Sequence, residues 1–247
     1  MFFGKFDSRF YWGILALIIA LSIFEYASNT NSLLNLVLSL PGVIVAITFH
    51  EWAHAFVADK LGDDTARRSG RLTLNPLKHI DPIGFFMLVF AHFGWGKPVQ
   101  IDERNFSKKK SVAASVALVS FAGPLMNFII TFVALLIQYA IYVFAYDFAL
   151  SQMGVIVTLI LQYIIIINLS LSIFNLLPLP PLDGSKIIMF FLPEKARDWF
   201  RTNATYFYMI FLILWITNIV ELIIDPIING AYNGLYFVVE SIFRLFM

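Results

Sequence analysis

The feature that most constrains this chain is a series of apolar runs, each about long enough to cross a lipid bilayer. They fall at about residues 10–27, 33–61, 112–145, 153–177 and 204–224. A helix needs about 20 mostly apolar residues to cross the hydrocarbon core. Composition agrees, because only 13% of the residues are charged, about half of what the surface of a soluble protein needs. The sequence therefore predicts an all-α polytopic membrane protein.

The runs predict a single integral-membrane domain over residues 1–247 with about 5–6 transmembrane helices. Its core covers about 33–201, an N-terminal anchor helix lies within 1–32, and C-terminal helices occupy 202–247. The tail from 227 onward fits either a sixth span or an interfacial helix. We expect no separate soluble domain, because the polar connections are too short to hold one.

A shorter element is expected between the second and third spans. The apolar piece 84–95 is too short to span a bilayer and suits a re-entrant segment. Residues 96–101 follow it with the composition of a strand and a turn. The prediction here is a short re-entrant or β-hairpin element.

Lysine and arginine positions give the orientation in the membrane. Before the tail they cluster in residues 5–9, 60–78, 97–110 and 186–201, whereas the connections 28–32 and 146–152 contain none. Basic loops stay on the cytoplasmic side, so the N-terminus and all four clusters are predicted there, most simply in a prokaryotic plasma membrane. The net charge of +1 offers no footprint for nucleic acid, and the absence of cysteine excludes thiolate metal sites.

One turn of the second apolar run holds the residues with metal chemistry. His50 and His54 are one helical turn apart, so both imidazoles can bind one metal ion. Glu51 lies beside them and can take a proton from an attacking water molecule. Ionisable groups inside a membrane are costly and usually functional, although a pair of histidines that hydrogen-bond to neighbouring helices is the simpler alternative.

A catalytic zinc ion wants three protein ligands and one open position. His79, His92 and a carboxylate are the candidates for the third, and Asp183 is the best of them. Asp183 ends the fourth long run, at a depth comparable to that of the two histidines in the predicted topology. The prolines at 178, 180 and 181 cannot continue a helix, so the backbone must unwind just before it.

Together these patterns resemble the site-2 protease family of intramembrane zinc metalloproteases. The resemblance covers roughly residues 40–200 and looks like a minimal member without a PDZ or regulatory domain. The matching segments are His50-Glu51-x-x-His54, Asn175-x-x-Pro178-x-Pro180-x-Leu182-Asp183-Gly184, and residues 62–63, 70–77, 79–82, 95–99 and 121–127.

The resemblance implies specific roles. His50, His54 and Asp183 would bind one Zn²⁺ per chain, Glu51 would be the catalytic base, and Asn175 would orient the substrate or stabilise the oxyanion. Asn127 is assigned either to substrate positioning or to a hydrogen bond between spans.

The implied reaction is hydrolysis of peptide bonds within or near transmembrane segments, as in regulated intramembrane proteolysis. Partners would be transmembrane protein substrates, the lipid bilayer and a regulatory membrane protein. Two alternatives stay open: a catalytically silent scaffold that binds membrane helices, and an ion or metal transporter that uses the same four ionisable residues as a relay.

Overall fold

The computed structural model describes residues 29–82, 84–85, 96–107, 109–217 and 219–245. Within these ranges the chain is helical, and the one contact of β type is an isolated antiparallel bridge between Ile80 and Gly96. The predicted N-terminal span at 10–27 and most of the predicted re-entrant piece, including His92, lie outside the described residues. The all-α prediction is confirmed for the part that is described.

Among the described residues, four helices are long and apolar enough to cross a membrane. They are α2 (Thr30–Lys60), α5 (Val112–Phe144), α7 (Gln152–Asn175) and α11 (Ile219–Arg244). The first three match the predicted runs to within a few residues. Side-chain caps help to set their first residues, because Ser111 accepts from the Ala114 N–H and Ser151 accepts from the Gly154 N–H.

Shorter helical elements connect the long ones. They are α3 (Thr65–Arg68), η1 (Pro76–Lys78), η2 (Glu103–Asn105), α6 (Tyr146–Leu150), α8 (Asp183–Phe191), α9 (Glu194–Thr202) and α10 (Ala204–Ile216). The predicted break before Asp183 is present, since residues 176–182 form turns and bends between α7 and α8.

The predicted bounds of the last spans are wrong. A single span was expected at about 204–224, but α10 ends at Ile216 and α11 runs from Ile219 to Arg244. The Thr217 hydroxyl donates to the carbonyls of Ile213 and Leu214, which competes with continued helix. The stretch long and apolar enough to span is therefore 222–244, which takes in most of the tail.

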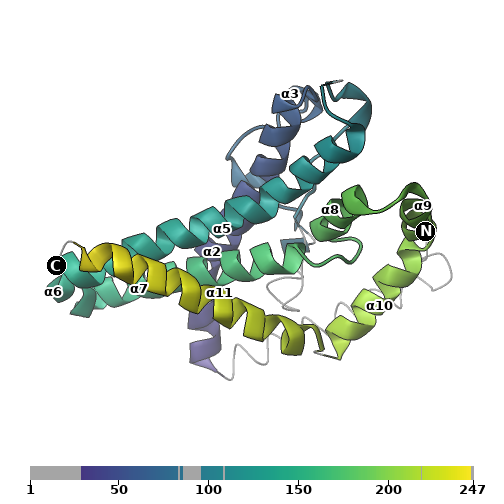
Figure 1. The fold of residues 1–247 in the computed structure, drawn as a ribbon. Coiled ribbons are helices and arrows are strands. Elements are labelled where there is room, and N and C mark those ends of the chain that lie inside the picture. The colour runs from purple at the N-terminus through teal and green to yellow at the C-terminus, as the bar shows by residue number, and fades with distance from the viewer. Residues whose placement is uncertain (1–28, 83, 86–95, 108, 218, 246–247) are drawn as a thin grey trace.

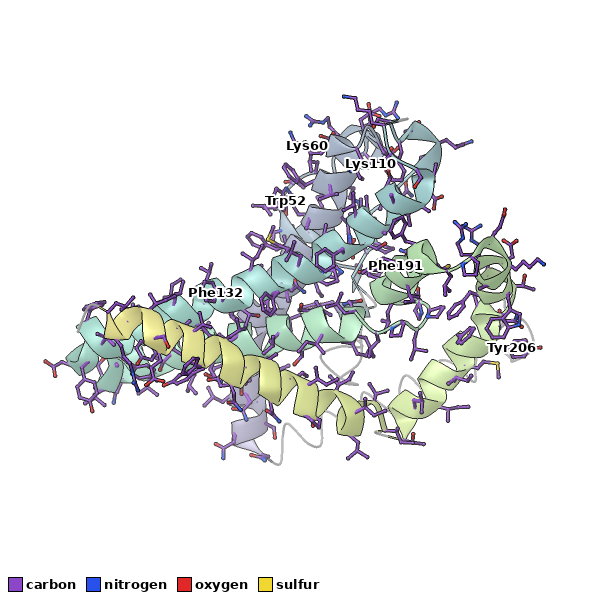
Figure 2. All side chains as sticks on the ribbon, viewed as in Figure 1. Trp52, Lys60, Lys110, Phe132, Phe191 and Tyr206 are labelled. Carbon is purple, nitrogen blue, oxygen red and sulfur yellow. The ribbon has the colours of Figure 1, made fainter. Side chains whose placement is uncertain are left out.

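Helices α5, α7 and α11 lie side by side, and α2 crosses α5 and α7 (Figure 1). Ala134, Leu135, Ile165 and Val239 form a buried cluster among α5, α7 and α11. The crossing of α2 with α7 is close at Gly42, where an added Cβ would lie 3.1 Å from the Tyr163 carbonyl oxygen. Lys60 and Lys110 lie at the same end of the molecule (Figure 2), as expected if the basic loops share one side.

Candidate metal centre

The two motif histidines lie where α2 crosses α5. Both are buried, and their rings meet edge to face with centroids 4.6 Å apart. The one-turn spacing read from the sequence thus places both side chains on one face of α2. His50 is ten residues before Lys60, about 15 Å from that end of the helix at 1.5 Å per residue. The pair is therefore deep in the helical part of the molecule.

Asp183 completes the cluster from the first position of α8. Its Oδ2 lies 3.1 Å from Nε2 of His50 and 3.1 Å from Nε2 of His54. Burial alone would raise the pKa of Asp183. The charge of His54 and hydrogen bonds from both histidines overcome this and hold the pKa well below its ordinary value, so the carboxylate is ionised at neutral pH.

Helix α5 passes directly against the histidines at Gly123. A Cβ at this position would lie 2.5 Å from Nε2 of His54 and 2.7 Å from Nε2 of His50, so no side chain fits there. The carbonyl of Val119, one turn earlier, lies 2.7 Å from Nδ1 of His54. A carbonyl can only accept, so Nδ1 of His54 carries a proton, and the ring would bind a metal ion through Nε2 once Nε2 gives up the proton that it donates to Asp183.

Asn127 approaches His50 from the next turn of α5. Its Nδ2 lies 3.4 Å from Nδ1 of His50, while its buried Oδ1 has no hydrogen-bond partner among the described residues. A 180° rotation of the amide would place Oδ1 against Nδ1, where it would accept the Nδ1–H of His50. That arrangement would place the ring proton of a neutral His50 on Nδ1, and Nε2, which lies 3.1 Å from Asp183 Oδ2, would be free for a metal ion.

The three side chains have the donor set of a zinc site. One ligand atom from each of His50, His54 and Asp183 lies within 4.8 Å of the other two, and all three residues are buried. Tetrahedral zinc with ligands at about 2.05 Å places them about 3.3 Å apart, close to the 3.1 Å that separates Asp183 Oδ2 from each Nε2. The described residues therefore fit a metal ion with two imidazoles and one carboxylate.

Glu51 lies next to this cluster on α2 and is partly accessible. Its Oε2 accepts a hydrogen bond from the Val99 backbone N–H at 2.8 Å. Residues 97–102 have no helix or strand assignment, so Glu51 is contacted by an irregular segment rather than by a packed helix.

The remaining predicted site residues lie elsewhere. The amide of Asn175 donates to the Leu171 carbonyl one turn earlier in α7, so its role toward a substrate stays a prediction. His79, an alternative third ligand, is not in the cluster: it is fully buried, with Nε2 2.7 Å from the Thr73 carbonyl oxygen. His79 is thus held inside its own loop and away from the metal cluster.

Sequence reasoning missed several contacts around the cluster. The backbone donors and acceptors at Val99 and Val119 have no sequence signature, because every residue carries a carbonyl and nearly every residue an N–H. Gly123 did offer a signal, since a glycine inside an apolar span often marks close approach of another helix.

Comparison with known proteins gives the family. A family model described as "Peptidase family M50" matches residues 140–217, which include Asp183. A Bacillus subtilis protein named "Putative zinc metalloprotease YwhC" is 37% identical over 205 residues, 82% of this chain and 90% of the relative. "Putative zinc metalloprotease Rip2" of Mycobacterium tuberculosis strain H37Rv is 30% identical over 208 residues, 81% of this chain and 72% of the relative. The Mycolicibacterium smegmatis protein of the same name is 28% identical over 187 residues, 73% of this chain and 67% of the relative.

No solved structure matches the chain. The sequence relatives nevertheless match most of its length. Their names describe zinc metalloproteases, which agrees with the donor set of the buried His-His-Asp cluster. This chain therefore belongs to peptidase family M50, the site-2 protease-like zinc metalloproteases.

Proposed function

We propose that the chain is an intramembrane zinc-dependent endopeptidase that hydrolyses peptide bonds within or near the transmembrane segments of membrane proteins. The observation that carries this proposal is the buried cluster of His50, His54 and Asp183 beside Glu51, on and between helices apolar enough to span a membrane. Residues 1–247 would form one protease domain with its N-terminus and site facing the cytoplasm.

In this proposal His50, His54 and Asp183 would hold the zinc ion, the two histidines through their Nε2 atoms. Val119 and Asn127 keep the two rings in the tautomer that ligation requires. Zinc, when bound, acts as a Lewis acid that polarises the peptide carbonyl and lowers the pKa of water toward 7.

Glu51 performs the proton transfers. Its carboxylate takes a proton from the attacking water and then gives that proton to the leaving nitrogen, so the peptide C–N bond breaks to release a neutral amine rather than an amide anion. Asn175 would stabilise the developing oxyanion once its amide leaves the Leu171 carbonyl.

Residues 96–101 are proposed to hold the unwound substrate as an added β-strand. The bridge between Ile80 and Gly96, with the Lys97 N–H donating to the His79 carbonyl, indicates extended pairing on one edge. By strand alternation, Gly96 and Gln100 present their backbone N–H groups to the opposite edge. Gln100→Pro should raise KM while Gln100→Ala does not, with zinc content unchanged in both; equal cleavage by the two variants would rule out strand addition.

The deciding experiment is zinc stoichiometry paired with cleavage of a single-span substrate, on detergent-purified protein. Wild type and Glu51→Gln should each hold one zinc ion per chain, Asp183→Ala should be depleted, and only wild type should cleave. Zinc in none of the three would favour the scaffold, and cleavage by Glu51→Gln would remove Glu51 as the base.

A further inference from the structure

The backbone segment 96–99 packs directly on the carboxylate of Glu51. The Val99 N–H donates to Oε2 at 2.8 Å, and a Cβ added at Gly96 would lie 3.9 Å from Oε1. The same Cβ would lie 2.8 Å from Cγ2 of Ile47, one turn before Glu51 on α2, so the segment lies against this face of the helix. The position of Val99 therefore sets how the Glu51 carboxylate is oriented.

Residues 78–80 hold this segment on its other side. The Lys97 N–H donates to the His79 carbonyl at 2.7 Å, and Gly96 bridges Ile80. The imidazole of His79 is itself fixed, because it is fully buried and its Nε2 donates to the Thr73 carbonyl at 2.7 Å. Two short pieces of loop thus support the Val99 N–H, which donates to Glu51.

Arg71 joins the two pieces. Its Nη1 donates to the Lys78 carbonyl and, at 3.2 Å, to the Lys97 carbonyl, one residue on from Gly96. The Arg71 backbone is anchored in turn, because its N–H donates to the Ala66 carbonyl at 2.8 Å just after Gly70, whose φ of +67° suits the absence of a side chain. A guanidinium that bonds two carbonyls from different segments fixes their separation.

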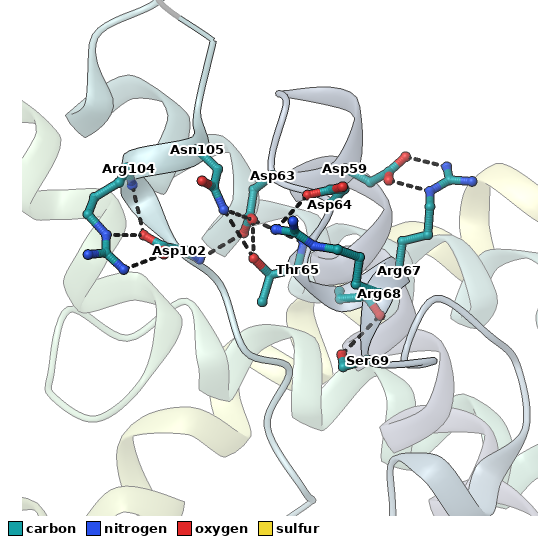
Figure 3. Close-up of polar contacts among 11 residues, drawn as sticks. Asp59, Asp63, Asp64, Thr65, Arg67, Arg68, Ser69, Asp102, Arg104 and Asn105 are labelled. Carbon is teal, nitrogen blue, oxygen red and sulfur yellow. Dashed lines mark hydrogen bonds and ion pairs between the residues drawn. The ribbon is translucent and has the colours of Figure 1, made fainter.

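A second attachment holds the same segment farther along. Asp63, fully buried, accepts from the Asp102 N–H, the Thr65 N–H and hydroxyl, and the Asn105 amide (Figure 3). Between the two attachments, Val99 is the residue whose N–H reaches Glu51. Arg71 is bonded two residues from Val99, whereas Asp63 is bonded three residues away on the other side.

We propose that Arg71 is a positioning residue for proteolysis, which orients the base Glu51 through the segment 96–99. The proposal rests on the proposed function, because it takes Glu51 as the base. Within the described part of the chain, Arg71 forms no hydrogen bond or ion pair with the metal cluster, so its loss should leave zinc binding in place and slow the proton transfers. A positional error of about 1 Å at a reacting group can cost about 100-fold in rate.

The test compares Arg71→Ala and Arg71→Lys with Arg104→Ala, a matched control whose guanidinium donates to Asp102. For Arg71→Ala we expect one zinc ion per chain and, at saturating substrate, a kcat about tenfold to 100-fold lower. Arg71→Lys should recover part of kcat, since an ammonium can still donate to a carbonyl, and Arg104→Ala should match wild type.

Hydrogen exchange supplies a readout that needs neither zinc nor turnover. In the metal-free chain the amides of Lys97 and of residues 99–101 should exchange faster in Arg71→Ala and in Glu51→Ala than in wild type. They should exchange as in wild type in Glu51→Gln, whose side-chain oxygen still accepts from the Val99 N–H. Unchanged exchange in Arg71→Ala, or kcat within twofold of wild type, would overturn the proposal.

A second variant covers a folding defect in Arg71→Ala. Val99→Pro removes the N–H that donates to Glu51, so it should retain one zinc ion per chain and lower kcat at least as far as Arg71→Ala does; a kcat within twofold of wild type would also overturn the proposal. If wild type neither holds zinc nor cleaves, the proposed function fails, while the exchange experiment still decides whether Arg71 orients Glu51.

Discussion

Replacing Gly123 by alanine tests the crossing of α2 and α5 on which the metal centre depends. The new Cβ would lie 2.5 Å from Nε2 of His54, and 2.6 Å and 2.7 Å from Cε1 and Nε2 of His50. Ordinary contacts between such atoms are about 3.5 Å, so the methyl group would be about 1 Å too close to both rings. It would also occupy space that the ligand nitrogens need for a metal ion.

Relief of this overlap is difficult because α5 cannot simply move away. Next to Gly123, the carbonyl of Pro124 accepts a hydrogen bond from the Ser172 hydroxyl of α7 at 2.8 Å. Overpacking of this kind typically costs about 1–3 kcal/mol. If the histidines rotate to absorb it, the same energy lowers zinc affinity by about tenfold to 100-fold.

The assay is zinc stoichiometry and competition with a chelator on detergent-purified Gly123→Ala, with thermal unfolding as a check on folding. Gly230→Ala in α11 is the control, because a Cβ at Gly230 meets no atom within 4 Å. The control should bind zinc as wild type does and gain about 0.5–1 kcal/mol of helix stability. If Gly123→Ala held one zinc ion with wild-type affinity and cleaved normally, the metal would lie away from the α5 backbone and the site described above would be wrong.

Three further predictions concern the surroundings of the cluster. Asn127→Leu should keep the fold but weaken zinc binding about tenfold to 100-fold, because Nδ1 of His50 loses its hydrogen-bond partner. Competition with a chelator measures this, with Asn127→Gln as the control that keeps an amide, and equal zinc affinity of Asn127→Leu and wild type would contradict it. Asp183→Glu should bind zinc more weakly than wild type but more tightly than Asp183→Ala, since the longer side chain keeps the carboxylate and misplaces it; equal depletion in both would argue against direct ligation. Burial raises the pKa of Asp63, but its hydrogen bonds outweigh this and hold the pKa below its ordinary value, so the ionised side chain stabilises the fold fully above about pH 4 and progressively less as the pH falls through the lowered pKa. Asp63→Asn should therefore lower the free energy of unfolding by about 1.5–3 kcal/mol at pH 7 and by less in acid. A difference in unfolding temperature between variant and wild type that does not shrink at low pH would refute this.

Much of the fold follows from hydropathy, because a bilayer-length apolar run has few other structures open to it. The runs at 33–61, 112–145 and 153–177 became α2, α5 and α7 nearly at their predicted bounds. The break at Thr217 was not visible in the same way. Apolar residues continue on both sides of it, and a single threonine hydroxyl that bonds back to Ile213 does not change the mean hydropathy.

Part of the candidate site could likewise be predicted from the sequence, and part could not. His50, His54 and Asp183 could be predicted because ionisable side chains are rare in apolar spans and their chemistry is specific. Their tautomers depend on a carbonyl at Val119, and a carbonyl is present at every residue. Such contacts arise only from how α5 crosses α2, which no local pattern in the sequence specifies.

Different parts of the structure hold the candidate metal ligands and the proposed base Glu51, so metal binding and turnover should be separable by mutation. Buried helices hold the three candidate ligands, so changes there, as at Gly123, should act first on zinc affinity. A loop segment fixed by Arg71 and His79 contacts Glu51, so changes in that loop should act first on kcat. Because the contacts of the metal ligands and those of the loop share no residue, the changes in activation free energy that Gly123→Ala and Arg71→Ala cause, each measured from kcat/KM, should add in the double variant. A strong departure from additivity would mean that the loop also shapes the metal site.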